Sequence, residues 1–243
     1  MMEEWIGVAE KQAPPLVELG ALYLCVRTDP ALKVDKIRDT LSAALRDPES
    51  IGVRREGWHF SSMDTGRDPK VIRGEKWIST GDQATGFRLL ECSSDGRLRF
   101  AVRMGREMFW GRTFEETQQS RTLHPYAISE TVSACLQLFR HLFGSVAESN
   151  SSVWACLRFT NSEGWILRPY RPGRGGFEFP RSWHTATQQD GIASMVARDD
   201  IESFNKHPHR LAWLMLTQLY ADFDHPEDAV PFYDRQTSRF TYD

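Results

Sequence analysis

The sequence predicts an α+β fold, in which a mixed sheet with hairpins is packed by three main helices. Strand-like segments occur in pairs joined by short turns, which gives two hairpins, and three segments with apolar residues at helical spacing interrupt them. Because hairpin strands pair antiparallel, this order favours α+β over a doubly wound parallel sheet. We expect a single two-lobed domain over residues 1–243, with a candidate hinge at the polar segment 147–152.

The chain should begin its core with a buried strand followed by a helix. Residues 17–27 are apolar on both faces, as in a central strand. Asp29-Pro30 suits the start of a helix and Asp47-Pro48 its end, which places a helix at 31–46. The buried stripe of this helix should consist of Val34, Ile37, Leu41 and Leu45.

A hairpin is predicted at 86–104, with its turn at 94–96 (Ser-Asp-Gly). This three-residue turn sets Glu91 opposite Arg99, so that opposite charges pair across the strands. A two-residue turn would instead set two arginines against each other. The charge pattern therefore favours the three-residue turn.

The remaining segments are assigned by the same patterns. An extended segment begins at 57–60, and the charged stretch 62–86 predicts a surface loop anchored by Trp77. The most regular helical pattern covers 125–143, which starts at a proline and ends before a glycine. Further elements are a hairpin of strands 153–159 and 164–170 around 161–163, strands near 176–183 and 191–197, and a helix at 208–223.

Composition and charge exclude several classes of protein. The chain has 30 Lys and Arg against 33 Asp and Glu, so affinity for a polyanion would need local patches. Its acidic start lacks the pattern of a secretory signal, and no apolar run approaches the roughly 20 residues that span a bilayer. The four cysteines stand far apart and resemble buried, reduced thiols. These observations predict a cytoplasmic protein that does not enter membranes.

The motifs of common enzymes and cofactor sites are not matched. The glycine-rich segment 172–176 lacks the spacing of a phosphate-binding loop, and Ser182 and His184 would lie about 7 Å apart on a strand. His207 and His209 are separated from the acidic group at 222–228 by a helix roughly 20 Å long, so the two groups cannot share a metal ion. We expect solvated imidazoles at both histidines, and we assign no catalytic residue, metal ligand or cofactor.

Two arginine clusters give the clearest functional signal. One follows a predicted strand where arginine alternates with apolar residues, and the other mixes arginine with aromatic residues, a combination that can bind a nucleic-acid backbone and stack bases. The candidate nucleic-acid or partner-binding residues are Arg97, Arg99, Arg103, Arg106, Arg168, Arg171, Arg174, Arg181, Trp110 and Trp183. Three interpretations stay open: a polyanion site, a surface for an acidic protein, or arginines that pair with the chain's own carboxylates.

Tryptophan is about twice as frequent as in an average protein, with eight in this chain. Trp154 and Trp213 lie on apolar patterns and are expected in the core. Trp5 and Trp77, like Trp110 and Trp183, lie in charged, turn-rich sequence, where a partner surface explains them more simply than a cofactor pocket does. The alternative is that these tryptophans anchor surface loops.

Several of these segments together resemble a known family. The order of strand, helix 32–45, Gly57-Trp58-His59-Phe60, the hairpin with Asp95-Gly96-Arg97-Leu98-Arg99-Phe100, and helix 125–143 resembles the carboxy-terminal accessory region of bacterial Schlafen-type AlbA-like ATP- or nucleic-acid-binding proteins. The resemblance covers residues 17–145 and rests on short motifs. It implies an accessory module in a nucleic-acid-handling or antiviral defence protein, and it assigns no functional residue.

The function expected from the sequence is therefore a non-enzymatic interaction module of a larger bacterial assembly. A protein partner is expected first, and nucleic acid second, through the arginine clusters. The alternative is a metal-dependent nuclease or hydrolase whose site no spacing rule reveals.

Overall fold

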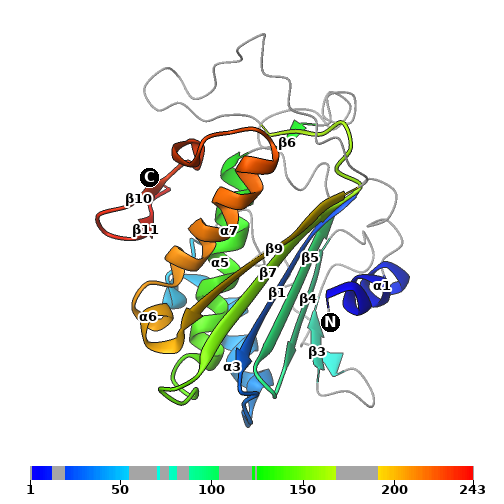
Figure 1. Cartoon of the computed structure of the whole chain (residues 1–243). Coiled ribbons are helices and arrows are strands. Elements are labelled where there is room, and N and C mark those ends of the chain that lie inside the picture. The colour runs from blue at the N-terminus through cyan, green and yellow to red at the C-terminus, as the bar shows by residue number, and fades with distance from the viewer. Residues whose placement is uncertain are drawn as a thin grey trace.

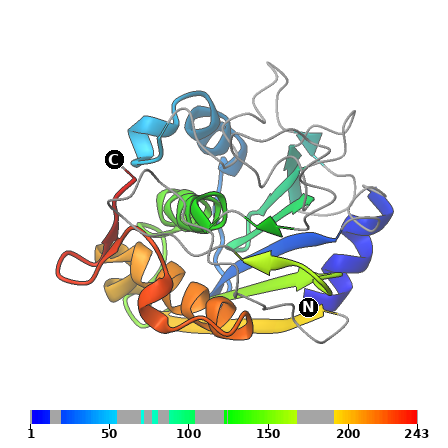
Figure 2. The same ribbon diagram turned by 90° about the horizontal axis from the view of Figure 1, so that it is seen from above.

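The fold is α+β, as the sequence predicts. The computed structural model describes residues 2–12, 20–54, 70–71, 77–80, 88–103, 122–123, 125–167 and 191–242. In this part of the chain an antiparallel sheet of seven strands separates two layers of helices (Figure 1). Helices α3 (Ile37–Arg46), α5 (Pro125–Phe143), α6 (Ile201–Lys206) and α7 (Pro208–Asp222) cover one face, and α1 (Met2–Gln12) lies against the other (Figure 2).

The strands of the sheet follow one another in an order that differs from the order along the chain. Across the sheet they are β2 (Lys70–Val71), β3 (Trp77–Thr80), β4 (Arg88–Ser93), β5 (Arg97–Arg103), β1 (Ala21–Asp29), β7 (Ser152–Thr160) and β9 (Gly191–Asp200). Two short ladders lie apart from it: β6 (Thr122–Leu123) pairs parallel with β8 (Ile166–Leu167), and β10 (Tyr233–Asp234) pairs antiparallel with β11 (Arg239–Phe240). Segment 147–151 joins α5 to β7, and β7 pairs directly with β1.

Strand β1 is buried on both faces, as its uninterrupted apolar sequence predicts. Leu22, Leu24 and Val26 belong to the large core beneath the helices, whereas Tyr23 and Cys25 belong to a smaller core beneath α1. Side chains alternate along a strand, so β1, β4 and β5 each contribute to both cores. We call the sheet face that carries the smaller core the α1 face.

The hairpin of β4 and β5 has the predicted register, because Glu91 lies opposite Arg99. Its turn also explains why the first predicted helix starts late. The carbonyl groups of Asp95 and Ser94 accept hydrogen bonds from the backbone N–H groups of Leu32 (2.9 Å) and Val34 (2.7 Å). Residues 31–34 are thus held on the hairpin turn, and the helix predicted at 31–46 begins only at Ile37.

Two other predictions are corrected by strand pairing. Part of the stretch 62–86, expected as a surface loop, forms β2 and β3, and β3 pairs with β4. The segment after the turn at 161–163, expected to pair back on β7, instead pairs with β6 through β8. Long-range partners decide both cases, and such partners leave no local signal.

The long helices lie where their periodicity places them. Helix α5 matches the predicted 125–143, and α7 begins at the predicted residue 208 and ends within one residue of 223. The buried residues of α5 extend around nearly its whole circumference, because the sheet, α3 and α7 all pack against it. Helix α1 was not predicted. None of the helices in the described ranges has the length and apolar character needed to cross a bilayer.

The segments predicted as extended at 57–60 and as a strand at 176–183 lie outside the described residues. The strand predicted near 191–197 is confirmed as β9, which continues to Asp200. The chain ends on the helix side of the sheet, opposite the N-terminal helix, as both ribbon views show.

Candidate functional site

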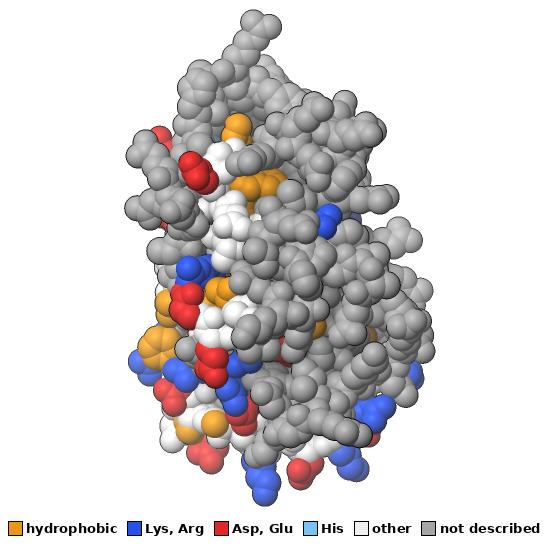
Figure 3. All heavy atoms as spheres, turned by 90° about the vertical axis from the view of Figure 1, so that its right-hand side faces the viewer, with side chains coloured by type: hydrophobic (Ala, Val, Ile, Leu, Met, Phe, Trp, Pro, Cys, Tyr) orange, Lys and Arg blue, Asp and Glu red, His pale blue; other side chains and the backbone are white. Residues whose placement is uncertain are grey.

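The α1 face of the sheet carries the described part of the predicted arginine surface. Strand pairing arranges its side chains in rows that run across the strands. One row contains Ser93, Arg97, Arg27, Trp154 and Arg198, and the next contains Glu91, Arg99, Cys25, Cys156 and Val196. Arg103 lies further along β5 and is partly buried. Figure 3 views the molecule from the side that carries α1 and shows hydrophobic side chains at the surface among basic and acidic ones.

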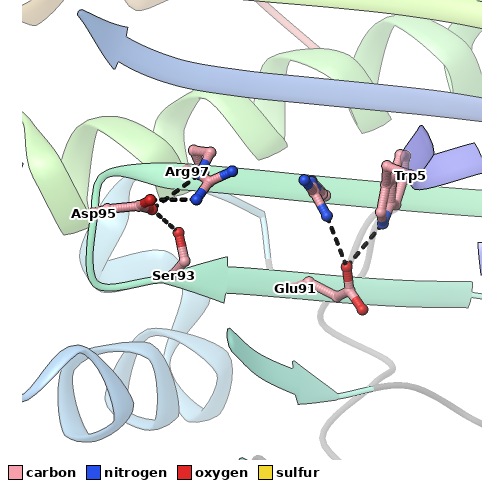
Figure 4. A network of polar contacts seen from close by, with 6 residues as sticks. Trp5, Glu91, Ser93, Asp95 and Arg97 are labelled. Atoms are coloured by element: carbon pink, nitrogen blue, oxygen red, sulfur yellow. Dashed lines mark hydrogen bonds and ion pairs between the residues drawn. The ribbon is translucent and has the colours of Figure 1, made fainter. Parts of the chain in front are cut away.

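Trp5 lies in the protein interior, which corrects the expectation of a partner surface. Its side chain is fully buried, and the ring meets that of Tyr23 edge-on at 5.3 Å between centroids. The indole Nε1–H donates a hydrogen bond of 2.7 Å to Glu91 (Figure 4). Trp5 therefore anchors α1 to the sheet.

Arg99 is also used internally. Its guanidinium lies 4.0 Å from the carboxylate of Glu91 and 5.9 Å from the ring centroid of Trp5, and only 11% of its side chain is exposed. Burial lowers the pKa of Arg99, although the nearby Cys25 and Glu91 act in the opposite direction. A guanidinium held between a carboxylate and an indole has little capacity left for a partner.

Arg97 is paired within the hairpin turn. Its guanidinium forms an ion pair with Asp95, which also accepts a hydrogen bond from Ser93 (Figure 4). Burial alone would raise the pKa of Asp95, but the hydrogen bonds from Arg97 and Ser93 lower it. The hydrogen bond to Asp95 in turn raises the pKa of Arg97. The pair holds the turn in place and neutralises the arginine.

The other predicted site residues cannot be placed. Arg106, Arg168, Arg171, Arg174, Arg181, Trp110 and Trp183 lie outside the described residues, and they stay predictions. Trp213, predicted in the core, is half-buried on α7 and stacks on Tyr233 at 5.2 Å. Trp154, also predicted in the core, lies instead on the α1 face and is only partly buried.

Trp154 is flanked by two arginines that the sequence did not single out. Arg27 lies opposite it on β1 and Arg198 opposite it on β9. The Arg198 guanidinium lies 4.9 Å from the indole centroid and donates a hydrogen bond of 2.8 Å to Ser152. Among the described residues, neither Arg27 nor Arg198 forms an ion pair with a carboxylate.

A cavity of about 180 Å³ opens beside this row. Its lining comes from β1, β5 and β7, from Met2 on α1, and from Val196 on β9, whose side chain is 50% exposed. Within the described structure, Arg27 Nε and Trp154 Nε1 are buried without a hydrogen-bond partner. Buried donors normally find an acceptor. The alternation of Trp154, Cys156 and Arg158 with apolar residues is the sequence signal that could have identified this face.

A second polar cluster lies between α5, α7 and the last residues. Arg54 forms an ion pair of 3.0 Å with the buried Glu130, and the hydroxyl groups of Ser133 and Tyr242 lie 2.6 Å apart. The cluster surrounds a small cavity of about 60 Å³. Tyr126 donates a hydrogen bond of 3.2 Å to the carbonyl group of Tyr242. These contacts hold the end of the chain against α5.

His209 belongs to this cluster, and it is mostly buried rather than solvated. Its Nδ1 accepts a hydrogen bond of 2.9 Å from the backbone N–H of Phe240, and its Nε2 lies 2.6 Å from the side-chain amide nitrogen of Gln137. Burial, followed by the charges of Arg140 and Arg239, lowers the pKa of His209 to about 4. A neutral ring with both nitrogens engaged is a structural group and a poor general base.

The predicted metal candidates remain apart from one another. His207 is exposed, whereas His225 is buried and hydrogen-bonded to the carbonyl group of Leu167 at 2.8 Å. Within the described ranges, no three His, Cys, Asp or Glu side chains gather as a metal site requires.

Comparisons of the chain with protein-family models, curated proteins and solved structures found no match.

Proposed function

We propose that this chain is an accessory interaction module whose α1 face binds an acidic segment of a protein partner. The observation that carries the proposal is the row Arg27, Trp154 and Arg198 beside the cavity. Two guanidiniums without a carboxylate counter-ion in the described structure flank one indole. Arginine and tryptophan are the side chains most enriched at the energetic centre of protein interfaces.

The charge balance of the face favours a protein partner over nucleic acid. Arg97, Arg99 and Arg158 each have a carboxylate neighbour, Asp95, Glu91 and Glu3 respectively. Of the arginines that the structure describes on this face, we offer Arg27 and Arg198 to a ligand, whereas strong DNA binders neutralise about 6 to 10 phosphates. Neutralising two phosphates would give a salt dependence with a logarithmic slope of only about 2.

The shape and polarity of the face suit a segment that carries both an acidic and an apolar side chain. The cavity is lined by Cys25 and Cys156 and by Val196, whose side chain is 50% exposed. An apolar side chain would fill the cavity, while one or two carboxylates would meet Arg27 and Arg198. Charged pairs at such a rim speed association and select the partner.

Crosslinking tests this placement with a matched control. A photoreactive phenylalanine analogue replaces Val196, which is 50% exposed, or Val146, which is 47% exposed and lies between α5 and β7. We expect one specific crosslinked partner from position 196, none from 146, and loss of the crosslink when Arg27→Glu and Arg198→Glu are combined. Equal labelling from both positions would contradict the proposal.

Defined probes identify the class of partner. Fluorescent peptides that alternate glutamate with leucine are compared with lysine-leucine peptides and with single-stranded DNA by anisotropy at several salt concentrations. The acidic peptides should bind, and the pair of charge reversals should weaken them by about 10-fold to 100-fold, or about 1.4 to 2.7 kcal/mol. Arg210→Glu on α7 is the control. Binding of DNA alone, with a steep salt dependence, would overturn the assignment to a protein partner.

A further inference from the structure

Two cysteines face each other across adjacent strands of the α1 face. Cys25 on β1 lies directly opposite Cys156 on β7, and both are thiols. Directly opposed residues in an antiparallel pair have Cα atoms about 4.5 to 5.5 Å apart. Disulfides accept Cα separations of about 4.4 to 6.8 Å. The backbone therefore already holds the two cysteines at a separation that a disulfide can bridge.

The two thiols differ in their access to solvent. Both line the cavity beside the arginine row, but Cys156 is partly exposed whereas only 7% of Cys25 is exposed. The other two cysteines, Cys92 and Cys135, are fully buried. A small oxidant that enters the cavity would thus meet Cys156 first and find Cys25 next to it.

The surroundings favour redox chemistry over metal binding at this pair. Arg27, which has no carboxylate counter-ion in the described structure, lines the same cavity, and its positive charge stabilises a thiolate and repels a metal cation. Burial raises the pKa of Cys25 to about 12, although the charge of Arg99 acts to lower it. Cys25 is therefore the less reactive thiol toward the oxidant, and it acts in the second step because it lies directly opposite the more exposed Cys156.

We propose that Cys25 and Cys156 form a reversible cross-strand disulfide when the chain meets hydrogen peroxide. In the first step the sulfur of Cys156 takes one oxygen from the peroxide and becomes a sulfenic acid, and the peroxide is reduced to water. In the second step the sulfur of Cys25 attacks, the S–S bond forms, the S–O bond breaks, and the hydroxyl group leaves with the thiol proton as a second water.

This disulfide would change the surface that binds the partner. Opposed side chains have Cβ atoms about 4.5 to 5.5 Å apart, and a disulfide draws them to about 3.5 to 4.5 Å. Closing the bond therefore moves the two side chains in the cavity, next to Arg27 and Trp154. A disulfide that is partly exposed in this way is readily reduced again, as in regulatory disulfides. The regulatory consequence rests on the proposed function, whereas the chemistry of the pair does not.

Mass spectrometry of the full chain tests the chemistry. After brief peroxide treatment and alkylation, we expect the loss of two hydrogen atoms, a linked pair of peptides containing Cys25 and Cys156, and reversal by dithiothreitol. In Cys25→Ser, a dimedone adduct should accumulate on Cys156, while Cys156→Ser should form no bridge. Cys92 and Cys135 serve as internal controls that stay alkylatable after unfolding.

The outcomes separate this inference from the proposed function. Over-oxidation of Cys156 without a bridge, or equal oxidation of Cys92 and Cys135, overturns the inference even when the acidic peptides bind. A bridge in a chain that binds no acidic peptide supports the inference and overturns the proposed function. Where both hold, the oxidised chain should bind the peptide about tenfold more weakly than the reduced chain.

Discussion

Replacing Trp5 by phenylalanine tests how α1 is attached to the sheet. The indole is fully buried, and its N–H donates a hydrogen bond of 2.7 Å to Glu91, which is itself only 2% exposed. Phenylalanine keeps an aromatic ring against Tyr23 but removes this donor. Because water cannot reach the carboxylate, the lost hydrogen bond cannot be replaced.

The size of the effect follows from two contributions. A hydrogen bond to a charged group contributes about 1.5 to 3 kcal/mol. The smaller ring leaves a gap in the core that adds about 1 kcal/mol. The free energy of unfolding should therefore fall by about 3 kcal/mol, which for a chain of this size lowers the melting temperature by about 6 to 12 °C.

A double-mutant cycle separates the hydrogen bond from the packing. Urea denaturation is measured for the wild type, Trp5→Phe, Glu91→Gln and the double variant. The two changes should be coupled by about 1 kcal/mol or more, because both act on one contact. The control is Trp213→Phe, which lies on the opposite side of the sheet and should add to Glu91→Gln without coupling.

Local detachment of α1 is the other way in which the variant could respond. An isolated helix of 11 residues is marginal in water, so α1 depends on its docking. Hydrogen exchange in residues 2–12 should therefore accelerate in Trp5→Phe before the rest of the chain unfolds. A cost below about 0.5 kcal/mol, the size of an ordinary surface substitution, would refute the anchoring role of Trp5.

Three further predictions concern the turn and the C-terminal cluster. The pKa of His209 in the folded chain is about 4, below the ordinary value of 6.5, so as the pH falls the unfolded chain binds a proton before the folded chain does. The free energy of unfolding should therefore fall by about 3 kcal/mol between pH 6.5 and pH 4. His209→Gln should flatten this slope in urea denaturation at successive pH values; an unchanged slope would contradict the assignment. Gly96→Ala should destabilise by about 2 to 4 kcal/mol in thermal unfolding, because φ is +85° and the new Cβ would lie 2.5 Å from Thr28 Oγ1; a neutral result would show that the turn is looser than described. Tyr242→Phe removes the hydrogen bond to Ser133, so the free energy of unfolding measured by urea titration should fall by about 1 kcal/mol. An unchanged free energy of unfolding would show that this hydrogen bond does not stabilise the fold.

Strong local patterns were sufficient for much of the fold. Helix 125–143 was predictable from its periodicity and flanking residues, because a buried stripe and end signals act within a few turns. The register of the β4–β5 hairpin was predictable from charge, since only one turn length pairs Glu91 with Arg99. In both cases the deciding interactions join residues close in sequence.

Contacts between distant residues account for most of the errors. Nothing near Trp5 in the sequence shows that it docks on Glu91, 86 positions away. Likewise, the start of α3 is delayed because Leu32 and Val34 are hydrogen-bonded to a turn about 60 residues later in the chain. These contacts exist only once the sheet is assembled, so local propensity cannot reveal them.

The register of the β4–β5 hairpin also bears on which arginines are available to a partner. The same register that fixed the hairpin placed a carboxylate opposite Arg99, so that arginine was already neutralised in the sequence. The informative arginine is Arg27, at the end of a strand that is otherwise buried on both faces. A charge in such a position needs a counter-charge, and the described structure supplies none. For this face, the arginines that remain after internal pairing are better guides to a partner than the total number of arginines.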